Sequence, residues 1–208
     1  MQEIREHWDN IYKTKDHKLV GWYQEYPAIS LELLSKINAE HAQSIIDVGC
    51  GASVLVDNLL LQGFYDITLL DLSEEALSSI KSRLVDNGNI PQYFAKDITA
   101  KLEFSHQFNI WHDRAVFHFL TKKEDRLAYM DNLAHYLSSD GHAIIGTFSL
   151  NGPNSCSGLN VVQYDEQKFK SELPQNFEVI ETVISTHIMP SGNEQEYIYF
   201  IIKHKLIN

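Results

Sequence analysis

Two closely spaced glycines and a later aspartate are the residues of this sequence best suited to hold a ligand. Gly49 and Gly51 follow the short apolar run 44–48, and Asp71 ends a second apolar run, 66–71. Glycines let the chain turn sharply and bring backbone N–H groups against a ligand, while the following helix offers its positive N-terminus. A carboxylate at Asp71 can accept hydrogen bonds from two ribose hydroxyls. The pattern predicts a βαβ unit that binds a ribose-containing ligand; the alternative is a tight strand-to-helix turn without a ligand.

A second group of reactive side chains, His112, Asp113 and Arg114, lies in the run 108–119. We expect this run to form the fourth strand, beside the first, so that its end faces the glycine loop across the switch point of the sheet. His112 or Asp113 could take a proton from a hydroxyl or ammonium substrate, because imidazole titrates near neutral pH. The alternative is an internal Asp113–Arg114 ion pair that braces the loop. His118 is expected to be a packed histidine.

The remaining sequence predicts alternating strands and helices that place these residues. Ser73 is the expected N-cap of a helix, Gly63 the expected C-cap of the helix before it, and Thr121 with Glu124 the capping box of a later helix. The polar run 149–159 predicts a long loop without regular structure, of the kind that is often functional. The other expected elements are a helix from Pro27, helix 54–62, strands 92–95 and 142–148, helix 164–173 and a hairpin of strands 177–187 and 196–204.

The residues Asp47-Val48-Gly49-Cys50-Gly51 followed by Asp71 resemble the first two motifs of class I S-adenosylmethionine-dependent methyltransferases. The third glycine of that family's loop is Ser53 here. The resemblance covers most of residues 1–204 and implies a Rossmann-like α/β fold: a seven-stranded, mostly parallel sheet with an antiparallel carboxy-terminal hairpin and helices on both faces. It implies S-adenosyl-L-methionine as cofactor and S-adenosyl-L-homocysteine as product. The cofactor-binding residues that it implies are Asp47, Gly49, Cys50, Gly51, Asp71, Leu72, Asp97 and Ile98, where Asp97 could instead be only a turn former.

The same resemblance suggests where a methyl acceptor would lie. In this family the segment before the first strand commonly forms a lid, and the aromatic-rich residues 1–38 make Trp22 and Tyr23 the best lid candidates, unless they only pack on the sheet. The opening and the Asp113-Arg114 pair are similar to those of thiopurine methyltransferases. Cys156 and Ser157 in the long loop are candidates to line the acceptor pocket, against the alternative of an ordinary flexible loop.

Composition limits the class of protein. The chain has 208 residues, 44% of them hydrophobic, and no linker-like stretch, so we expect one domain over 1–208 with 1–38 as a lid segment. A net charge of −11 without a basic cluster argues against nucleic acid as substrate. Without a signal peptide or a membrane span, a cytoplasmic protein is expected. The ten histidines show no metal-ligand spacing, so no metal is expected unless His112, Cys156 and His187 converge, which would suit a metalloid or thiol substrate.

The sequence therefore predicts a methyltransferase that acts on a small-molecule acceptor by direct in-line transfer. A protein-lysine acceptor is the alternative within the class. Two other classes remain: a nicotinamide-dependent oxidoreductase, whose glycine fingerprint would need a glycine in place of Val54, and a non-catalytic S-adenosylmethionine-binding module. The acceptor atom and the oligomeric state do not follow from the sequence.

Overall fold

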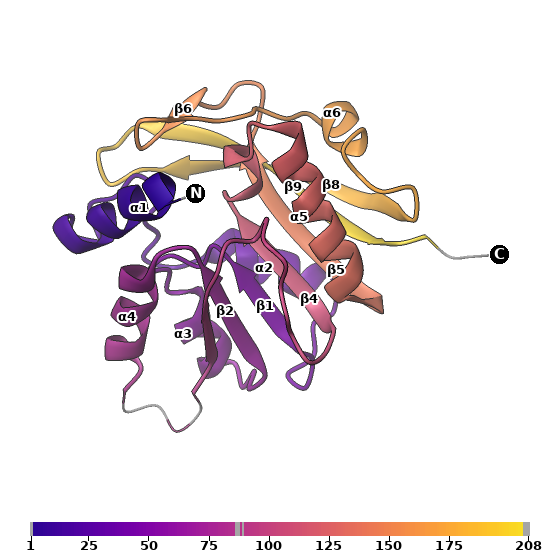
Figure 1. Ribbon diagram of the computed structural model, residues 1–208, viewed down its shortest axis with the longest axis horizontal. Helices are drawn as coiled ribbons and strands as arrows, with labels where there is room; N and C mark the ends of the chain where they lie inside the picture. The colour runs from indigo at the N-terminus through magenta and orange to yellow at the C-terminus, as the bar shows by residue number, and fades with distance from the viewer. Residues whose placement is uncertain (1, 86–87, 89, 206–208) are drawn as a thin grey trace.

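The centre of the structure is a seven-stranded sheet with the strand order β3-β2-β1-β4-β5-β9-β8 (Figure 1). This computed structural model describes residues 2–85, 88 and 90–205. Strands β3, β2, β1, β4 and β5 are parallel, whereas β9 runs antiparallel to β5 and to β8. The strands are β1 Ile45–Val48, β2 Ile67–Asp71, β3 Gln92–Ala95, β4 Phe108–Arg114, β5 Leu137–Phe148, β8 Phe177–Ile188 and β9 Glu194–His204. The predicted Rossmann-like sheet with its carboxy-terminal antiparallel hairpin is confirmed.

Helices cover both faces of this sheet. On one face α2 (Ala28–Lys36), α3 (Leu55–Leu61) and α4 (Glu74–Arg83) bury their apolar side chains against the strands. On the other face α5 (Lys123–Tyr136) and α6 (Glu166–Lys170) do the same. Helix α1 (Gln2–Thr14) lies apart from these layers, next to α4, near the carboxyl ends of the first strands (Figure 1).

The helix caps follow the sequence in two places and depart from it in one. The Ser73 hydroxyl accepts a hydrogen bond from the Ala76 N–H at 3.2 Å, as predicted for an N-cap. Gly63, with φ +92°, follows the end of α3 in a conformation that favours glycine. The capping box predicted at Thr121 was wrong: α5 begins one residue later than that box requires, with Lys122 at the N-cap and no side-chain cap. Thr121 lies instead on the wall of a cavity described below.

Two strand predictions also need correction. Strand β5 begins at Leu137 rather than at His142, because Leu137 already pairs with Phe108 and an irregularity in register absorbs the residues between. The run 149–159 is not wholly irregular. Its β6 (Ser155–Cys156) pairs antiparallel with β7 (Leu159–Asn160), and the two residues between them both have positive φ, which is typical of a tight hairpin turn.

The position of β1 decides where a ligand can bind. It pairs with β2 on one side and with β4 on the other, so that Val48 lies opposite both Leu70 and Asp113. The carboxyl ends of three parallel strands therefore meet at the point where the strand order reverses. Open α/β sheets bind ligands at such a switch point.

Candidate active site

The glycine loop begins where β1 ends. Gly49 and Gly51 have φ of +63° and +54°, a region in which residues with a Cβ are strained. A Cβ at Gly49 would overlap Val116, and one at Gly51 would overlap the Tyr12 hydroxyl. Both positions therefore require glycine, and the loop is held between the chain after β4 and helix α1.

Asp71 stands at the end of β2 and closes this loop. Its Oδ2 accepts a hydrogen bond from the Gly51 N–H and its Oδ1 one from the Ser73 N–H, both at 2.8 Å. Burial raises the pKa of Asp71 to about 6, although the two backbone hydrogen bonds oppose that shift. Each oxygen has a further lone pair, so an ionised Asp71 can still accept from two ligand hydroxyls.

Asp97 follows β3 on the next loop. Its Oδ1 accepts from both the N–H and the hydroxyl of Thr99, each at 2.8 Å, so the aspartate does form a turn. It also lines the cavity described next, together with Leu72 and Ile98. The turn-forming role and the binding role predicted from the sequence are thus compatible.

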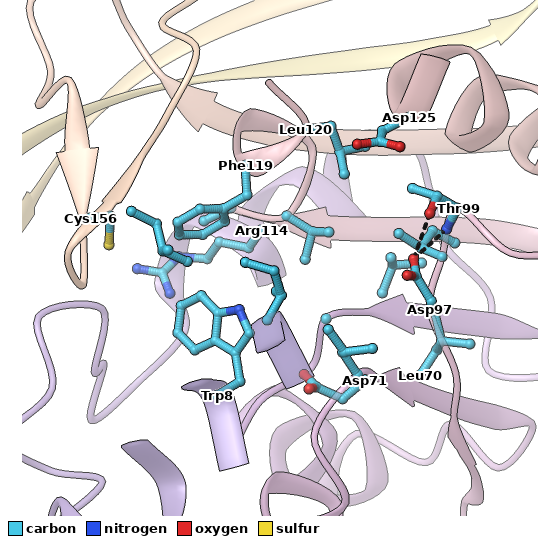
Figure 2. A pocket seen from close by; sticks show the side chains of 18 of the residues that line it. Trp8, Leu70, Asp71, Asp97, Thr99, Arg114, Phe119, Leu120, Asp125 and Cys156 are labelled. Atoms are coloured by element: carbon cyan, nitrogen blue, oxygen red, sulfur yellow. Dashed lines mark hydrogen bonds between the residues drawn. The ribbon is translucent and has the colours of Figure 1, made fainter. Parts of the chain in front are cut away.

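A cavity of about 390 Å³ joins these loops. It runs over the ends of β1, β2 and β4, and α1 covers it with Trp8 and Tyr12. Trp8 packs edge-to-face against Trp22, with ring centroids 5.7 Å apart. It packs in the same way against Phe119, at 5.3 Å (Figure 2). The volume of the cavity lies at the low end of the roughly 300–1,000 Å³ that is typical of small-molecule sites.

The three predicted catalytic residues point in different directions, because side chains alternate along β4. His112 faces α2: its Nδ1 lies 2.7 Å from Asp47 Oδ1 and its Nε2 lies 2.9 Å from Ser30 Oγ. These three side chains resemble a serine–histidine–aspartate relay, but each is at least 97% buried. His112 is not among the described residues that line the cavity, so a proton-transfer role for it would require a rearrangement.

Asp113 faces the opposite side of the sheet. It accepts hydrogen bonds from the Val116 and Phe117 N–H groups and from the Tyr129 hydroxyl, at 2.7 to 3.1 Å. Burial raises its pKa to about 7. Asp113 thus braces the chain after β4, but not through the predicted ion pair with Arg114, since no ion pair of the described residues includes Arg114. Of the three predicted catalytic residues, Arg114 lines the cavity.

The structure brings together about half of the other predicted site residues. Gly49, Asp71, Leu72, Asp97, Ile98, Trp22 and Cys156 all line the cavity. The other predicted residues are not among its described lining residues. Asp47 is buried at the end of β1, Cys50 is buried within the glycine loop, and Gly51 lies against the Tyr12 hydroxyl. Tyr23 lines a separate groove beside β8, and Ser157 occupies the β6–β7 turn.

Several cavity residues were not predicted as site residues. Trp8 and Tyr12 carried a signal, because with Ile4 they lie four residues apart and therefore on one face of α1. Tyr197 carried none, since nothing in the β9 sequence indicates which end of that strand reaches the site. The other polar or aromatic examples among the described lining residues are Lys96, Thr99, Phe119, Thr121, Asp125 and Asn160.

Two further properties concern the described part of the chain. Within it, no group of three or more histidine, cysteine, aspartate or glutamate residues is arranged to hold a metal ion, so His112, Cys156 and His187 do not converge. None of its helices has the length and apolar character needed to cross a membrane.

Comparison with known proteins shows a matching domain family and a shared fold. The model of a methyltransferase domain family matches residues 46–143. The fold also superposes with a TM-score of 0.70 on the N-methyltransferase NodS from Bradyrhizobium japonicum in complex with S-adenosylhomocysteine, at 13% identity, over 97% of this chain and 98% of that one. Residues 46–143 therefore match a methyltransferase domain, and the chain has the fold of S-adenosylmethionine-dependent methyltransferases. S-adenosylmethionine is accordingly the cofactor for which the site must be tested.

Relatives of this chain differ in the methyl acceptors that their names give. An eEF1A lysine and N-terminal methyltransferase homolog from Drosophila melanogaster is 28% identical over 111 residues, which are 52% of this chain and 16% of the relative. A ubiquinone biosynthesis O-methyltransferase from Vibrio cholerae is 23% identical over 120 residues, 57% of this chain and 47% of the relative. The chain thus spans less than half the length of either relative.

The residues present fit the nucleoside part of this cofactor. Asp71 has unused lone pairs in the cavity, and Asp97 uses only one of its two oxygens in the turn. Gly49 lines the cavity with a backbone that no larger residue could adopt there without overlap. Leu72 and Ile98, which follow the two acids in sequence, add apolar side chains to the same wall.

Proposed function

We propose that the chain transfers a methyl group from S-adenosylmethionine to a small organic molecule. The observation that carries this proposal is the cavity itself. Carboxylates suited to a nucleoside line one end, and the other end is walled by aromatic side chains and covered by α1. A small acceptor fits such a covered, aromatic space more readily than a lysine side chain presented by a folded protein.

Within this proposal, Asp71 holds the ribose hydroxyls and Asp97 the adenine amino group, with Leu72 and Ile98 against the base. The chain at Gly49 accommodates the rest of the cofactor. Three further residues hold the loop in place: Asp47 through its hydrogen bond to His112, Cys50 through its burial, and Gly51 through the hydrogen bond from its N–H to Asp71.

The bound cofactor supplies an electrophilic methyl group on a sulfonium. The protein must then hold the acceptor in line with that methyl group and keep water away, because positioning accounts for much of the acceleration in such a transfer. Trp8, Trp22 and Phe119 provide an apolar wall for the acceptor. Cys156 and Arg114 add polar groups at the same end.

Of the predicted lid segment 1–38, the part from α1 to Trp22 acts in this proposal as a lid, whereas α2 belongs to the helices that cover the sheet. Helix α1 is fastened to the cofactor end of the site, because the Ser73 hydroxyl donates to Asp9 Oδ1 at 2.5 Å. Trp22 is fastened to the acceptor end, because its carbonyl oxygen accepts from Arg114 Nη1 at 3.0 Å. Opening the lid therefore breaks one hydrogen bond at each end of the cavity.

A radiolabel experiment separates small from protein acceptors. The protein is incubated with methyl-tritiated S-adenosylmethionine and either the low-molecular-weight filtrate of a cell extract or the retained protein fraction. Enzyme-dependent label in a new small molecule supports the proposal, provided that Asp71→Ala abolishes it. Label only in the protein fraction would favour a protein acceptor, and no transfer to either fraction, with S-adenosylhomocysteine still bound, would favour a non-catalytic binding module.

A further inference from the structure

Charge is unevenly distributed along the cavity. Asp71, Asp97 and Asp125 lie at one end, where Lys96 also reaches the wall. Figure 2 shows these acids on one side and Arg114 on the other, near Cys156 and Trp8. At its own end, Arg114 is the one charged residue among the described lining residues. The part of a ligand that lies there therefore meets a single positive charge.

The guanidinium of Arg114 is only partly hydrogen-bonded. Its Nη1 donates to the Trp22 carbonyl oxygen. Its Nε and Nη2 are buried and make no well-formed hydrogen bond to the described residues, although the Tyr199 hydroxyl interacts with the guanidinium. Leaving a buried donor unsatisfied costs about 1–3 kcal/mol, and more when the group is charged. Nε and Nη2 share one edge of the planar group, and that edge matches the two oxygens of a carboxylate.

The neighbours of Arg114 do not supply that carboxylate. The Tyr197 ring lies 5.3 Å from the guanidinium carbon, and the Tyr199 hydroxyl, a phenol rather than a carboxylate, interacts with the guanidinium. His118 is near enough for Arg114 to help lower its pKa to about 3, after the larger effect of burial, so it is neutral. Its Nδ1 accepts from the Phe148 N–H, which leaves the proton on Nε2. The surroundings of Arg114 thus hold aromatic rings, tyrosine hydroxyls and a further N–H donor.

We propose that the methyl acceptor is a small planar molecule with a carboxylate, and that the Nε–Nη2 edge of Arg114 binds this carboxylate. The inference rests on the methyltransferase function proposed above. Because both atoms are closed to solvent in the structure, binding turns the free edge of the guanidinium toward the cavity that Arg114 already lines. The aromatic walls of Trp8, Trp22, Phe119 and Tyr197 then pack against the body of the acceptor.

Nuclear magnetic resonance of arginine Nε–H groups tests this directly. The chain has four arginines, Arg5, Arg83, Arg114 and Arg126, and the Arg114→Lys variant assigns the relevant signal. Benzoate, added to protein saturated with S-adenosylhomocysteine, should move the Arg114 signal to saturation, whereas neutral benzamide should not. Arg83 and Arg126 are internal controls, because their Nε–H groups already donate to Asp57 and Glu172. Arg114→Lys should weaken benzoate binding by about tenfold or more, since lysine cannot form the bidentate contact.

A second measurement identifies the source of the carboxylate, since the cofactor also has one. Binding of S-adenosylhomocysteine and of 5′-methylthioadenosine, which lacks the amino-acid tail, is compared in wild type and Arg114→Gln. We expect both affinities to change by less than about threefold, because Arg114 serves the acceptor. A large loss for S-adenosylhomocysteine alone would assign the carboxylate to the cofactor and overturn the inference.

Failure of the inference is distinguishable from failure of the proposed function. If S-adenosylhomocysteine binds but benzoate leaves the Arg114 signal unmoved, or benzamide moves it equally, the inference is wrong and the cofactor assignment stands. If neither nucleoside binds the wild-type protein, the proposed function is wrong and the inference falls with it.

Discussion

Asp71 should make cofactor affinity depend on pH. Its pKa is raised to about 6 by burial, so only about one tenth of the molecules carry an ionised Asp71 at pH 5, against nearly all at pH 8. A protonated carboxyl cannot accept from its two backbone N–H partners and from two ribose hydroxyls as well. If only the ionised form binds, the affinity for S-adenosylhomocysteine is about tenfold weaker at pH 5 than at pH 8, or about 1.4 kcal/mol.

Calorimetric titration from pH 5 to pH 8 measures this dependence in wild type and in Asp71→Asn. The amide does not titrate, so the variant should bind about 1–3 kcal/mol more weakly at pH 8 and should show no pH dependence of its own. Asp131→Asn, which removes an exposed carboxylate from α5, is the matched control and should behave like wild type. A flat wild-type profile, or a tenfold dependence that survives in Asp71→Asn, refutes the reasoning.

Three predictions concern stability, measured by chemical or thermal unfolding. Gly49→Ala should destabilise the folded protein more than Gly158→Ala. Both glycines have positive φ, which costs an alanine about 1 kcal/mol, but of the two only Gly49 has a neighbour that a Cβ would overlap. Equal losses of stability in the two variants would contradict this prediction. The pKa of Asp113 rises from 3.8 to about 7 on folding, so its contribution to the stability of the folded protein is full below pH 4 and is lost as pH rises through 7. Asp113→Asn should reduce this fall of stability with pH, and an unchanged dependence of stability on pH would contradict the prediction. His112→Ala leaves Asp47 buried without its partner and should cost about 3–5 kcal/mol, with cofactor affinity changed less than twofold; a large loss of affinity in folded protein would show a direct binding role.

Much of the fold could be predicted because local signals agree with one another. The apolar runs, the Ser73 N-cap and the Gly63 turn define βαβ units, and short connections leave few ways to arrange them. The cofactor end of the site could be predicted for the same reason. Gly49 and Asp71 lie at strand ends, and strand ends meet at one edge of a parallel sheet.

The acceptor end was harder to predict, because its residues come from places that local sequence does not connect. Side chains along β4 alternate, so His112 and Asp113 are buried on opposite faces of the sheet, while Arg114 reaches the cavity at the end of the strand. Tyr197 reaches the same cavity from β9, through antiparallel pairing with Phe148. Such contacts depend on register and strand length, which composition and periodicity do not specify.

Thermal unfolding with S-adenosylhomocysteine, and in parallel with NADH, tests the central claim most directly. A ligand at one hundred times its dissociation constant adds about 2.7 kcal/mol to the stability of the folded state, which raises the midpoint by several degrees. The account predicts this rise with S-adenosylhomocysteine, no rise with NADH, and loss of most of the rise in Asp71→Ala. A rise with NADH alone, or with neither ligand, would contradict the assignment of the cavity to S-adenosylmethionine.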